Sequence, residues 1–205
     1  AEARKGAAEG TVVIADEQTA GKGRLGRTWL SPKGSIALSV ILYPDRIYLP
    51  SLVMLASLAV VHSIQAVTNL KPGIKWPNDI LINGRKVCGI LIESDVQGNK
   101  VNYAIIGIGI NVNLRLADFP ELQPIATSLA DELGGQVSRL SLIKQLLVET
   151  EKSYLALLAG QSPYQEWRDN LITLGKRIRA RTGETIYEGI AELAEDGSLW
   201  LRQDN

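Results

Sequence analysis

Apolar positions alternate along some segments of the chain, as in strands, and recur every three or four residues in others, as in helices. Asn83-Gly84 lies between two alternating apolar runs and is a dipeptide that strongly favours a two-residue hairpin turn. A further run follows the turn residues Gly98-Asn99, so we expect three successive antiparallel strands. The predicted strands are 11–15, 36–42, 79–82, 86–93 and 101–113.

The longest apolar segment, 49–67, predicts a helix that begins at Pro50. Apolar residues surround most of its circumference, which is typical of a helix buried in a protein core. Pro50 and several polar residues, among them His62, interrupt the apolar run, whereas a bilayer requires about 20 predominantly apolar residues in succession. We therefore interpret the segment as a core helix and expect no membrane contact.

Two further helices are predicted in the second half of the chain. Ser128 to Asp131 has the pattern of a capping box, in which two residues cap each other's backbone N–H groups, and Gly134 ends the short helix. A longer helix is expected to begin near Ser141, to end at Gly160 and to cover one face of the sheet. Its apolar stripe consists of Leu142, Ile143, Leu146, Leu147, Tyr154, Leu157 and Leu158.

After residue 174 the pattern changes to short alternating runs separated by glycine-containing turns. The chain ends directly after the last run, so we expect this small β module to be incomplete. The predicted fold class is α+β, with a mixed, largely antiparallel sheet packed with helices. The predicted domains are 1–174 and 175–205, and the strands of the second are 177–181, 185–193 and 199–202.

The 205 residues are 45% hydrophobic and 21% charged, as in an ordinary globular protein, so disorder along the whole chain is excluded. Lys and Arg balance Asp and Glu at 22 each, and the chain lacks the positive excess of a nucleic-acid binder. Cys88 is the single cysteine and His62 the single histidine, which excludes an intrachain disulfide and a structural zinc site. This cysteine usage fits a cytosolic setting.

The glycine-rich loop 21–34 concentrates positive charge without any acidic residue. Its glycines allow backbone N–H groups to approach an anion, so the loop is either a phosphate or carboxylate site or a solvated basic loop. The letters GKGRLG match the dinucleotide fingerprint G-x-G-x-x-G, but a strand follows instead of a helix, so a Rossmann site is not expected. No Walker A motif occurs. The four cations are Lys22, Arg24, Arg27 and Lys33.

Four sequence blocks are Gln18-Thr19-Ala20-GKGRLGRTW, Lys75-Trp76-Pro77-Asn78-Asp79, Lys86-Val87-Cys88-Gly89-Ile90-Leu91-Ile92-Glu93 and Gly107-Ile108-Gly109-Ile110-Asn111-Val112-Asn113. In this order and spacing they resemble the biotin protein ligases. The resemblance extends from about Gly10 to Asn113 and is weaker through the C-terminal module. The related lipoyl ligases come closest to the same combination.

The resemblance implies a biotin/lipoyl ligase fold with an SH3-like C-terminal module, and a reaction in two steps. Family members activate biotin with ATP and Mg²⁺ to biotinyl-5′-AMP, and then transfer biotin to one lysine of a biotin carboxyl carrier protein. Arg24 and Lys86 match positions that reduce the repulsion between the two reacting anions. Asp79 matches an acid that orients the carrier lysine or accepts its proton. From the residues alone, Lys86 could be a solvated hairpin residue and Asp79 part of a turn.

The resemblance also assigns binding residues, and no metal ligand among the side chains. Lys22 replaces the arginine usual in the family, which keeps the charge but loses the planar fork needed for bidentate contact. Trp29 matches an aromatic residue that packs against adenine, although it could instead be a core residue. The biotin-binding residues are Gln18, Gly21, Lys22, Gly23, Arg24, Lys86, Gly89, Leu91, Gly107 and Gly109, and the ATP-binding residues are Arg24, Arg27, Trp29, Asn78, Lys86 and Asn111.

Two other functions remain open from the sequence. A lipoate or octanoate ligase of the same fold would activate a different acid. The biotin-sensing core of a transcriptional repressor would depend on a separate DNA-binding domain, and nucleic-acid contact through this chain is not expected. A homodimer is possible, since family members often pair through a sheet edge. The family's Ser-Thr-Asn segment, which binds the biotin ring, would precede residues 1–10, which are expected to form the end of a helix.

Overall fold

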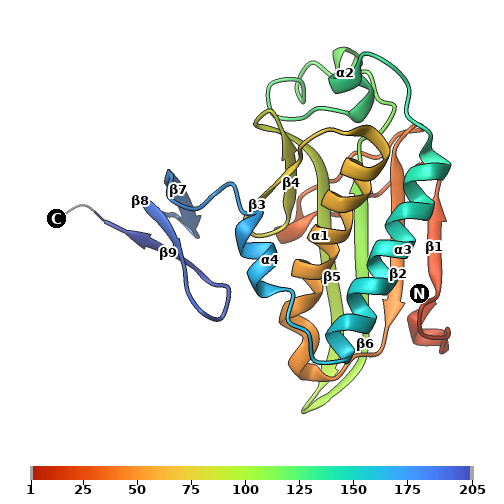
Figure 1. Ribbon diagram of the computed structural model, residues 1–205, viewed down its shortest axis with the longest axis vertical. Coiled ribbons are helices and arrows are strands. Elements are labelled where there is room, and N and C mark those ends of the chain that lie inside the picture. Colours follow the sequence, from red (N-terminus) through yellow and green to blue (C-terminus); the bar gives the residue numbers. More distant parts are fainter. Residues whose placement is uncertain (1, 204–205) are drawn as a thin grey trace.

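The computed structural model describes residues 2–203. Its main sheet contains β1 Val12–Ala15, β2 Ile36–Leu42, β3 Gly73–Lys75, β4 Asp79–Ile82, β5 Arg85–Gln97 and β6 Lys100–Ile110. The order across the sheet is β1-β2-β6-β5-β4-β3, and all neighbours are antiparallel (Figure 1). The expected hairpin joins β4 to β5, and Asn83 and Gly84 both have the positive φ of a type I′ turn. The predicted α+β fold class is confirmed.

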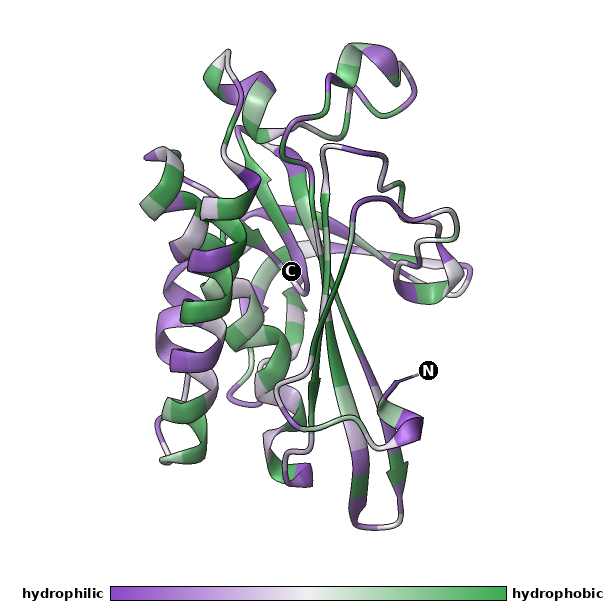
Figure 2. Ribbon diagram, turned by 90° about the vertical axis from the view of Figure 1, so that its right-hand side faces the viewer, coloured by the Kyte–Doolittle hydropathy of each residue, from purple (hydrophilic) through white to green (hydrophobic). Residues whose placement is uncertain are grey.

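Two long helices, α1 Leu49–Thr68 and α3 Arg139–Leu158, lie side by side over one face of this sheet (Figures 1 and 2). Loop 16–34 lies on the opposite side of the sheet (Figure 2). The helical layer therefore leaves one sheet face available for a site. The shorter elements are α2 Leu129–Leu133, α4 Tyr164–Asp169, and the 3₁₀ turns η1 Ala3–Lys5, η2 Arg24–Gly26, η3 Arg46–Tyr48 and η4 Leu116–Asp118.

Helix α1 is the central core helix, as the sequence predicts. Pro50 lies in its first turn, where the missing N–H costs no hydrogen bond, and Asn69 ends it in a left-handed conformation. Its length and apolar composition would suffice to cross a membrane, but eleven of its twenty residues are buried inside the molecule. It lies against α3, α4 and strands β3 to β6. This burial is the ordinary arrangement of a core helix.

The two faces of the central strands have different compositions because side chains alternate across a sheet. On β6, Ile106, Ile108 and Ile110 join the buried core beneath α1. Gly107 and Gly109, between them, lie on the opposite face. The same alternation continues on β5, where the core positions are Cys88 and Ile90 and the opposite positions are Gly89 and Leu91.

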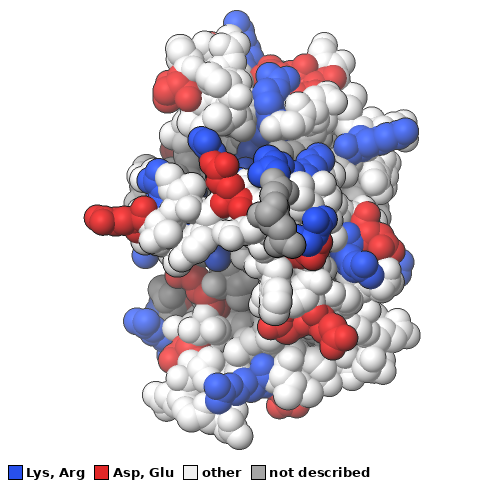
Figure 3. Space-filling model, turned by 90° about the vertical axis from the view of Figure 1, so that its left-hand side faces the viewer, with Lys and Arg blue, Asp and Glu red and all other residues white. Residues whose placement is uncertain are grey.

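A second sheet contains β7 Arg177–Thr182, β8 Thr185–Leu193 and β9 Leu199–Arg202 in the order β7-β8-β9. These strands confirm the predicted β module. Trp76 fixes this sheet to the larger one, since its indole Nε1 donates a hydrogen bond to the Gly197 carbonyl at 3.0 Å. Positive and negative side chains are interspersed on the side of the molecule that carries this module (Figure 3).

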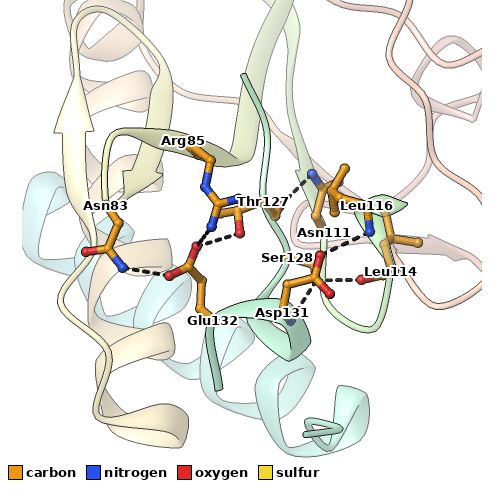
Figure 4. A network of polar contacts seen from close by, with 9 residues as sticks. All are labelled: Asn83, Arg85, Asn111, Leu114, Leu116, Thr127, Ser128, Asp131 and Glu132. Atoms are coloured by element: carbon orange, nitrogen blue, oxygen red, sulfur yellow. Dashed lines mark hydrogen bonds and ion pairs between the residues drawn. The ribbon is translucent and has the colours of Figure 1, made fainter. Parts of the chain in front are cut away.

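A buried carboxylate ties α2 to the β4–β5 hairpin (Figure 4). Glu132 accepts hydrogen bonds from Asn83 Nδ2 and Thr127 Oγ1, both at 2.6 Å, and from Arg85 Nη2 at 2.7 Å. Burial alone would raise its pKa, but these bonds and the positive charge of Arg85 outweigh burial and lower the pKa. The ionised form of Glu132 is therefore the one that the fold stabilises.

We expect Glu132→Gln to lower the free energy of unfolding by about 2 kcal/mol at neutral pH, the scale of hydrogen bonds to a charged group. A lowered pKa makes this contribution complete above the ordinary value of 4.5, and it is lost as the pH falls through the folded-state value. Urea unfolding at pH 7 and at pH 3 measures it. Glu121→Gln, at an exposed position, is the control; equal losses in both variants would contradict the prediction.

Several predicted boundaries were wrong because backbone groups find partners outside the expected element. The strand predicted to reach residue 113 ends at Ile110, and the carbonyl oxygens that follow, of Asn111 and Val112, accept from the N–H groups of Leu129 and Ala130 instead of from a strand. The capping box is half formed: Ser128 Oγ accepts from the Asp131 N–H, but the Asp131 carboxylate accepts from the N–H of Leu116.

The helical predictions need three corrections. Helix α3 begins at Arg139 rather than near residue 141, because Ser138 Oγ accepts from the Ser141 N–H and caps it. Leu158, assigned to its buried stripe, is exposed. Residues 2–10 contain a single 3₁₀ turn, η1, instead of the end of a longer helix; residue 1 lies outside the described residues.

Candidate functional site

A cleft of about 940 Å³ opens on the sheet face opposite the helices. Strands β2, β5 and β6 form its floor, loop 16–34 and the segment 75–79 form its rim, and the C-terminal sheet lines one side. Thirteen of the predicted site residues line this cleft: Gln18, Lys22, Gly23, Arg24, Arg27, Trp29, Asn78, Asp79, Lys86, Gly89, Leu91, Gly107 and Gly109.

Loop 16–34 folds back on itself over the floor of the cleft. The Gln18 N–H donates to the Ser31 carbonyl and the Trp29 N–H donates to the Gly21 carbonyl, both at 2.9 Å. At its tip, Leu25 adopts a left-handed conformation and is 89% exposed. The loop thus has a hydrogen-bonded base and an exposed apolar tip.

The indole of Trp29 approaches the backbone of the two central strands closely at Gly89 and Gly109. Gly89 and Gly109 are paired across β5 and β6 and have no side chains to hold the indole away. A Cβ at Gly109 would lie 2.5 Å from Trp29 Cε2 and 2.9 Å from Cζ2, closer than real Cβ atoms come. The indole Nε1 is buried without a hydrogen-bond partner among the described residues. Glycine is therefore required at position 109 by the position of this indole.

Lys86 and Asp79 form an ion pair on the floor of the cleft. Lys86 Nζ lies 2.6 Å from Asp79 Oδ1 and 5.2 Å from the centroid of the Trp29 ring. Both side chains are largely buried. The backbone of Lys86 is fixed as well, since its N–H donates to the Ile125 carbonyl and its carbonyl accepts from Thr127. The structure thus holds one cation and one carboxylate together beside the indole.

Arg24 reaches from the loop to the rim of the sheet. Its Nη1 donates to Asn78 Oδ1 at 3.1 Å, and Asn78 Nδ2 donates to the Ile90 carbonyl at 2.7 Å. Asn78 is consequently oriented by β5 and presents its oxygen to the guanidinium. This chain of contacts brings together two residues that are 54 positions apart in the sequence.

Two predicted site residues do not line the cleft. Asn111 is buried, and its Nδ2 donates to the Thr127 carbonyl at 3.0 Å, so the amide supports the segment that follows β6. Gly21 is buried at the base of the loop, where an added Cβ would clash with the Trp29 carbonyl oxygen. Their roles in binding ATP and biotin stay predictions.

The contribution of the C-terminal module to the cleft could not be predicted from the sequence. These residues lie far along the chain from the four motif blocks and belong to no recognisable motif of their own. Contacts of the module with distant segments bring them to the cleft wall, among them the hydrogen bonds from Trp76 to Gly197 and from Tyr164 to Ala194. They are Ala180, Arg181, Thr182, Tyr187, Leu199, Leu201 and Gln203.

Cys88 and His62 do not line this cleft. Cys88 is buried in the core, and burial raises the pKa of its thiol. His62 Nε2 lies 2.9 Å from Glu166 Oε1 and its Nδ1 lies 3.7 Å from Glu149 Oε2, so its ring has partners on α3 and α4. Both residues are structural.

Loop 16–34 is expected to exchange its backbone amide hydrogens faster than β2 and β6 in the ligand-free chain. Few of its amides have backbone partners, and residues 22–28 lie mostly exposed above the cleft. Hydrogen–deuterium exchange read by mass spectrometry measures this. Protection of the loop equal to that of the core strands would disprove it.

Residues 4–111 match the model of the Biotin/lipoate A/B protein ligase family. The chain belongs to this family. The family region contains the four motif blocks up to Asn111 and most of the cleft floor. Membership confirms the resemblance read from those blocks.

Curated relatives and solved structures agree with the family. Bifunctional ligase/repressor BirA of Bacillus spizizenii is 44% identical over 97% of this chain, which spans 63% of that protein. Biotin--[acetyl-CoA-carboxylase] ligase of Paracoccus denitrificans is 36% identical over 93% of this chain and 83% of its own length. Biotin protein ligase from Aquifex aeolicus in complex with biotin and ATP has a TM-score of 0.83, with 30% identity, and covers 95% of this chain and 83% of its own.

The chain spans less than two thirds of the length of the Bacillus relatives it matches. The coverage of the Aquifex structure nevertheless includes nearly all of the present chain, so the sheet, the helical layer and the cleft belong to the family fold.

Proposed function

We propose that this chain activates biotin with ATP and transfers it to a lysine of a biotin carboxyl carrier protein. The observation that carries the proposal is the convergence of Arg24, Asn78, Asp79 and Lys86 on one cleft, above a floor where Gly89 faces Gly109. Relatives named for biotin ligation and a neighbour solved with biotin and ATP support the choice of substrates.

The first step joins two anions, and the cations of the cleft serve this step. A carboxylate oxygen of biotin bonds to the α-phosphorus of ATP, the bond to the bridging oxygen of the β-phosphate breaks, and pyrophosphate leaves. Arg24 on the loop and Lys86 on β5 supply positive charge from two sides of the cleft. Because their side chains are held by Asn78 and Asp79, little reorganisation is needed as charge moves.

The second step transfers the acyl group to an amine. The carrier lysine nitrogen bonds to the carbonyl carbon of the adenylate, the bond to AMP breaks, and the nitrogen loses a proton. A lysine ammonium with a pKa of about 10.4 must be neutral to attack. Asp79 is the carboxylate on the cleft floor that we assign to orienting this lysine and accepting the proton, with its oxygen held by Lys86.

We propose Mg²⁺ as a companion of ATP. No group of three or more His, Cys, Asp and Glu side chains within residues 2–203 is arranged to hold a metal ion. Mg²⁺ commonly keeps several waters and binds through substrate phosphates with one or two carboxylates, so a site built only by protein is not required. The residues of this chain act on biotin and on the carrier lysine. The proposed setting is the cytosol, in keeping with the free thiol of Cys88.

ATP–pyrophosphate exchange with biotin, lipoate or no acid, coupled to mass detection of the acyl-adenylate, tests the proposal. Biotin-dependent exchange and a biotinyl-AMP mass are expected. If only lipoate supports exchange, the substrate is lipoate, the other acid in the name of the family, and the assignment of biotin is wrong. No exchange with either acid would overturn the assignment of a ligase activity to this chain.

Arg24→Ala is expected to release more acyl-adenylate into solution relative to carrier labelling. Arg24 links the loop to the sheet rim through Asn78, so its loss opens the contact that retains the intermediate. Free biotinyl-AMP and labelled carrier are quantified in one reaction by mass spectrometry. Arg46→Ala, at an arginine outside the cleft, is the control. An unchanged ratio of released adenylate to labelled carrier would count against this role.

A further inference from the structure

The outer face of α3 carries an apolar stripe that no element of the described chain covers. Leu140, Val148 and Leu155 are 62%, 56% and 58% exposed, although α3 also has a well-buried face. The buried face packs on α1. In Figure 1 α3 is drawn with no other element in front of it.

Two charged residues complete the stripe. Lys144 and Glu151 are exposed and lie in the same sector of the helix as the three apolar residues, within about a quarter of its circumference. The stripe from Leu140 to Leu155 is about 22 Å long at 1.5 Å per residue. Neither charged side chain has an ion pair or hydrogen bond to any residue between 2 and 203. The stripe therefore presents one positive and one negative group without an internal partner.

Four of the five positions in the stripe are symmetric about the point between Leu147 and Val148, and Val148 lies next to that point. In an antiparallel pair of α3 helices related by a two-fold axis at this point, Leu140 lies opposite Leu155 of the second copy. Lys144 then lies opposite Glu151 of the second copy, and the same two contacts recur on the other side of the axis. A parallel pair would instead place Lys144 beside Lys144, which repulsion disfavours. The charge pattern therefore selects the antiparallel arrangement.

We propose that the outer stripe of α3 (Leu140, Lys144, Val148, Glu151 and Leu155) docks against the same stripe of a second copy of this chain. The occupant is a second copy because hydrophobic and charged positions are both self-complementary under one axis. Helix α3 lies on the sheet face opposite the cleft, so this pairing leaves the cleft open to substrates. The surface is therefore separate from the proposed ligase chemistry.

A single helical stripe buries less surface than the roughly 800 Å² per partner of a standard protein interface. We therefore expect a weak dimer that dissociates at micromolar concentrations, and a helix crossing of one of the ridge-into-groove classes. Leu140 and Leu155 supply the apolar contact at each end, and the paired charges fix the direction.

Sedimentation velocity over a concentration series of the chain of residues 1–205 tests the proposal. Lys144→Glu and Glu151→Lys, each alone, place like charges opposite each other twice and are expected to weaken the dimer at least about tenfold. The double variant restores opposite charges and is expected to restore association. Leu155→Ser is expected to weaken it as well. Circular dichroism and the biotin-dependent exchange reaction verify that each variant remains folded.

Lys71→Glu and Glu121→Lys make the same charge changes at exposed positions away from α3 and are expected to leave the dimer unchanged. A chain that stays monomeric up to about 1 mM would overturn the proposal. The stripe would then bind a different protein or none. A dimer that is insensitive to the α3 variants, or a double variant that fails to recover, would also overturn it. Recovery in the double variant is the result that only direct pairing of these two residues predicts.

Discussion

Lys86→Met is expected to lower the rate of biotinyl-adenylate formation by roughly 10²–10³. The Lys86 ammonium is held between Asp79 and Trp29, so its charge is in place before the reaction begins. Methionine has a similar length and no charge. The interaction strengthens as charge develops in the transition state, so the loss should appear mainly in kcat. ATP–pyrophosphate exchange at saturating biotin and ATP measures it.

Lys100→Met is the matched control for this variant. Lys100 is an exposed lysine at the beginning of β6, at the end of the hairpin remote from the cleft. Near-normal exchange is expected there. Because Lys86→Met leaves Asp79 without its partner, Lys86→Met/Asp79→Asn separates two causes. If removing the carboxylate charge restored exchange in the double variant, the lysine would serve to neutralise the charge of Asp79, and the assignment of its own charge to the first step would be wrong.

Gly109→Ala is expected to lower adenylate formation about 10²-fold, since displacement of site groups by about 1 Å can have this effect. The new methyl group would overlap the Trp29 indole, and the backbone of a central strand cannot retreat from it. The indole must then leave its position over Gly89, where it also contacts Lys86. Exchange kinetics measure the effect, and acrylamide quenching of tryptophan fluorescence reports the greater exposure of the indole.

Two comparisons make the Gly109 experiment specific. Gly135→Ala adds a methyl group where no atom lies within 4 Å and should change neither readout. In a Trp29→Ala background the overlap no longer exists, so adding Gly109→Ala should cost far less than it does in the parent chain. If the two substitutions reduced the rate independently, overlap with the indole would not be the cause.

Those parts of the fold that depend on local chemistry could be predicted from the sequence. Asn83-Gly84 predicts its hairpin because both residues tolerate positive φ, and the strands on either side alternate as a half-buried sheet requires. Pro50 predicts the beginning of α1 because proline suits the first turn of a helix. Each of these signals depends on the residue itself or on its immediate neighbours.

Elements fixed by distant contacts could not be predicted in the same way. Strand β3 has only three residues and is held by pairing with β4 and by the Asn170 carbonyl, which accepts from Ile74. Helix α4 has six residues and is anchored by the burial of Trp167. Neither is long enough to establish a period of its own.

The same distinction between local signals and distant contacts applies to the candidate site. The motif blocks predict most of the residues that line the cleft. They do not predict that the Asn111 side chain points away from it, because its amide donates to the Thr127 carbonyl. Nor could the sequence predict that Glu132 would join Asn83, Arg85 and Thr127, because these residues come from two segments that are 47 to 49 positions apart at Glu132. The side-chain network is a property of the assembled fold.

The alternation of glycine and isoleucine on β6 determines how substitutions and deletions in this strand affect the structure. A substitution at Gly107 would add a side chain on the cleft face, whereas the side chain of Ile110 is fully buried in the core and does not line the cleft. Deleting Ile108 would shift every following residue of the strand to the opposite face, turning Ile110 toward the cleft and Gly109 into the core. Point substitutions on one face of the strand can therefore reshape the cleft while the core is kept, whereas a change in the length of the strand alters both at once.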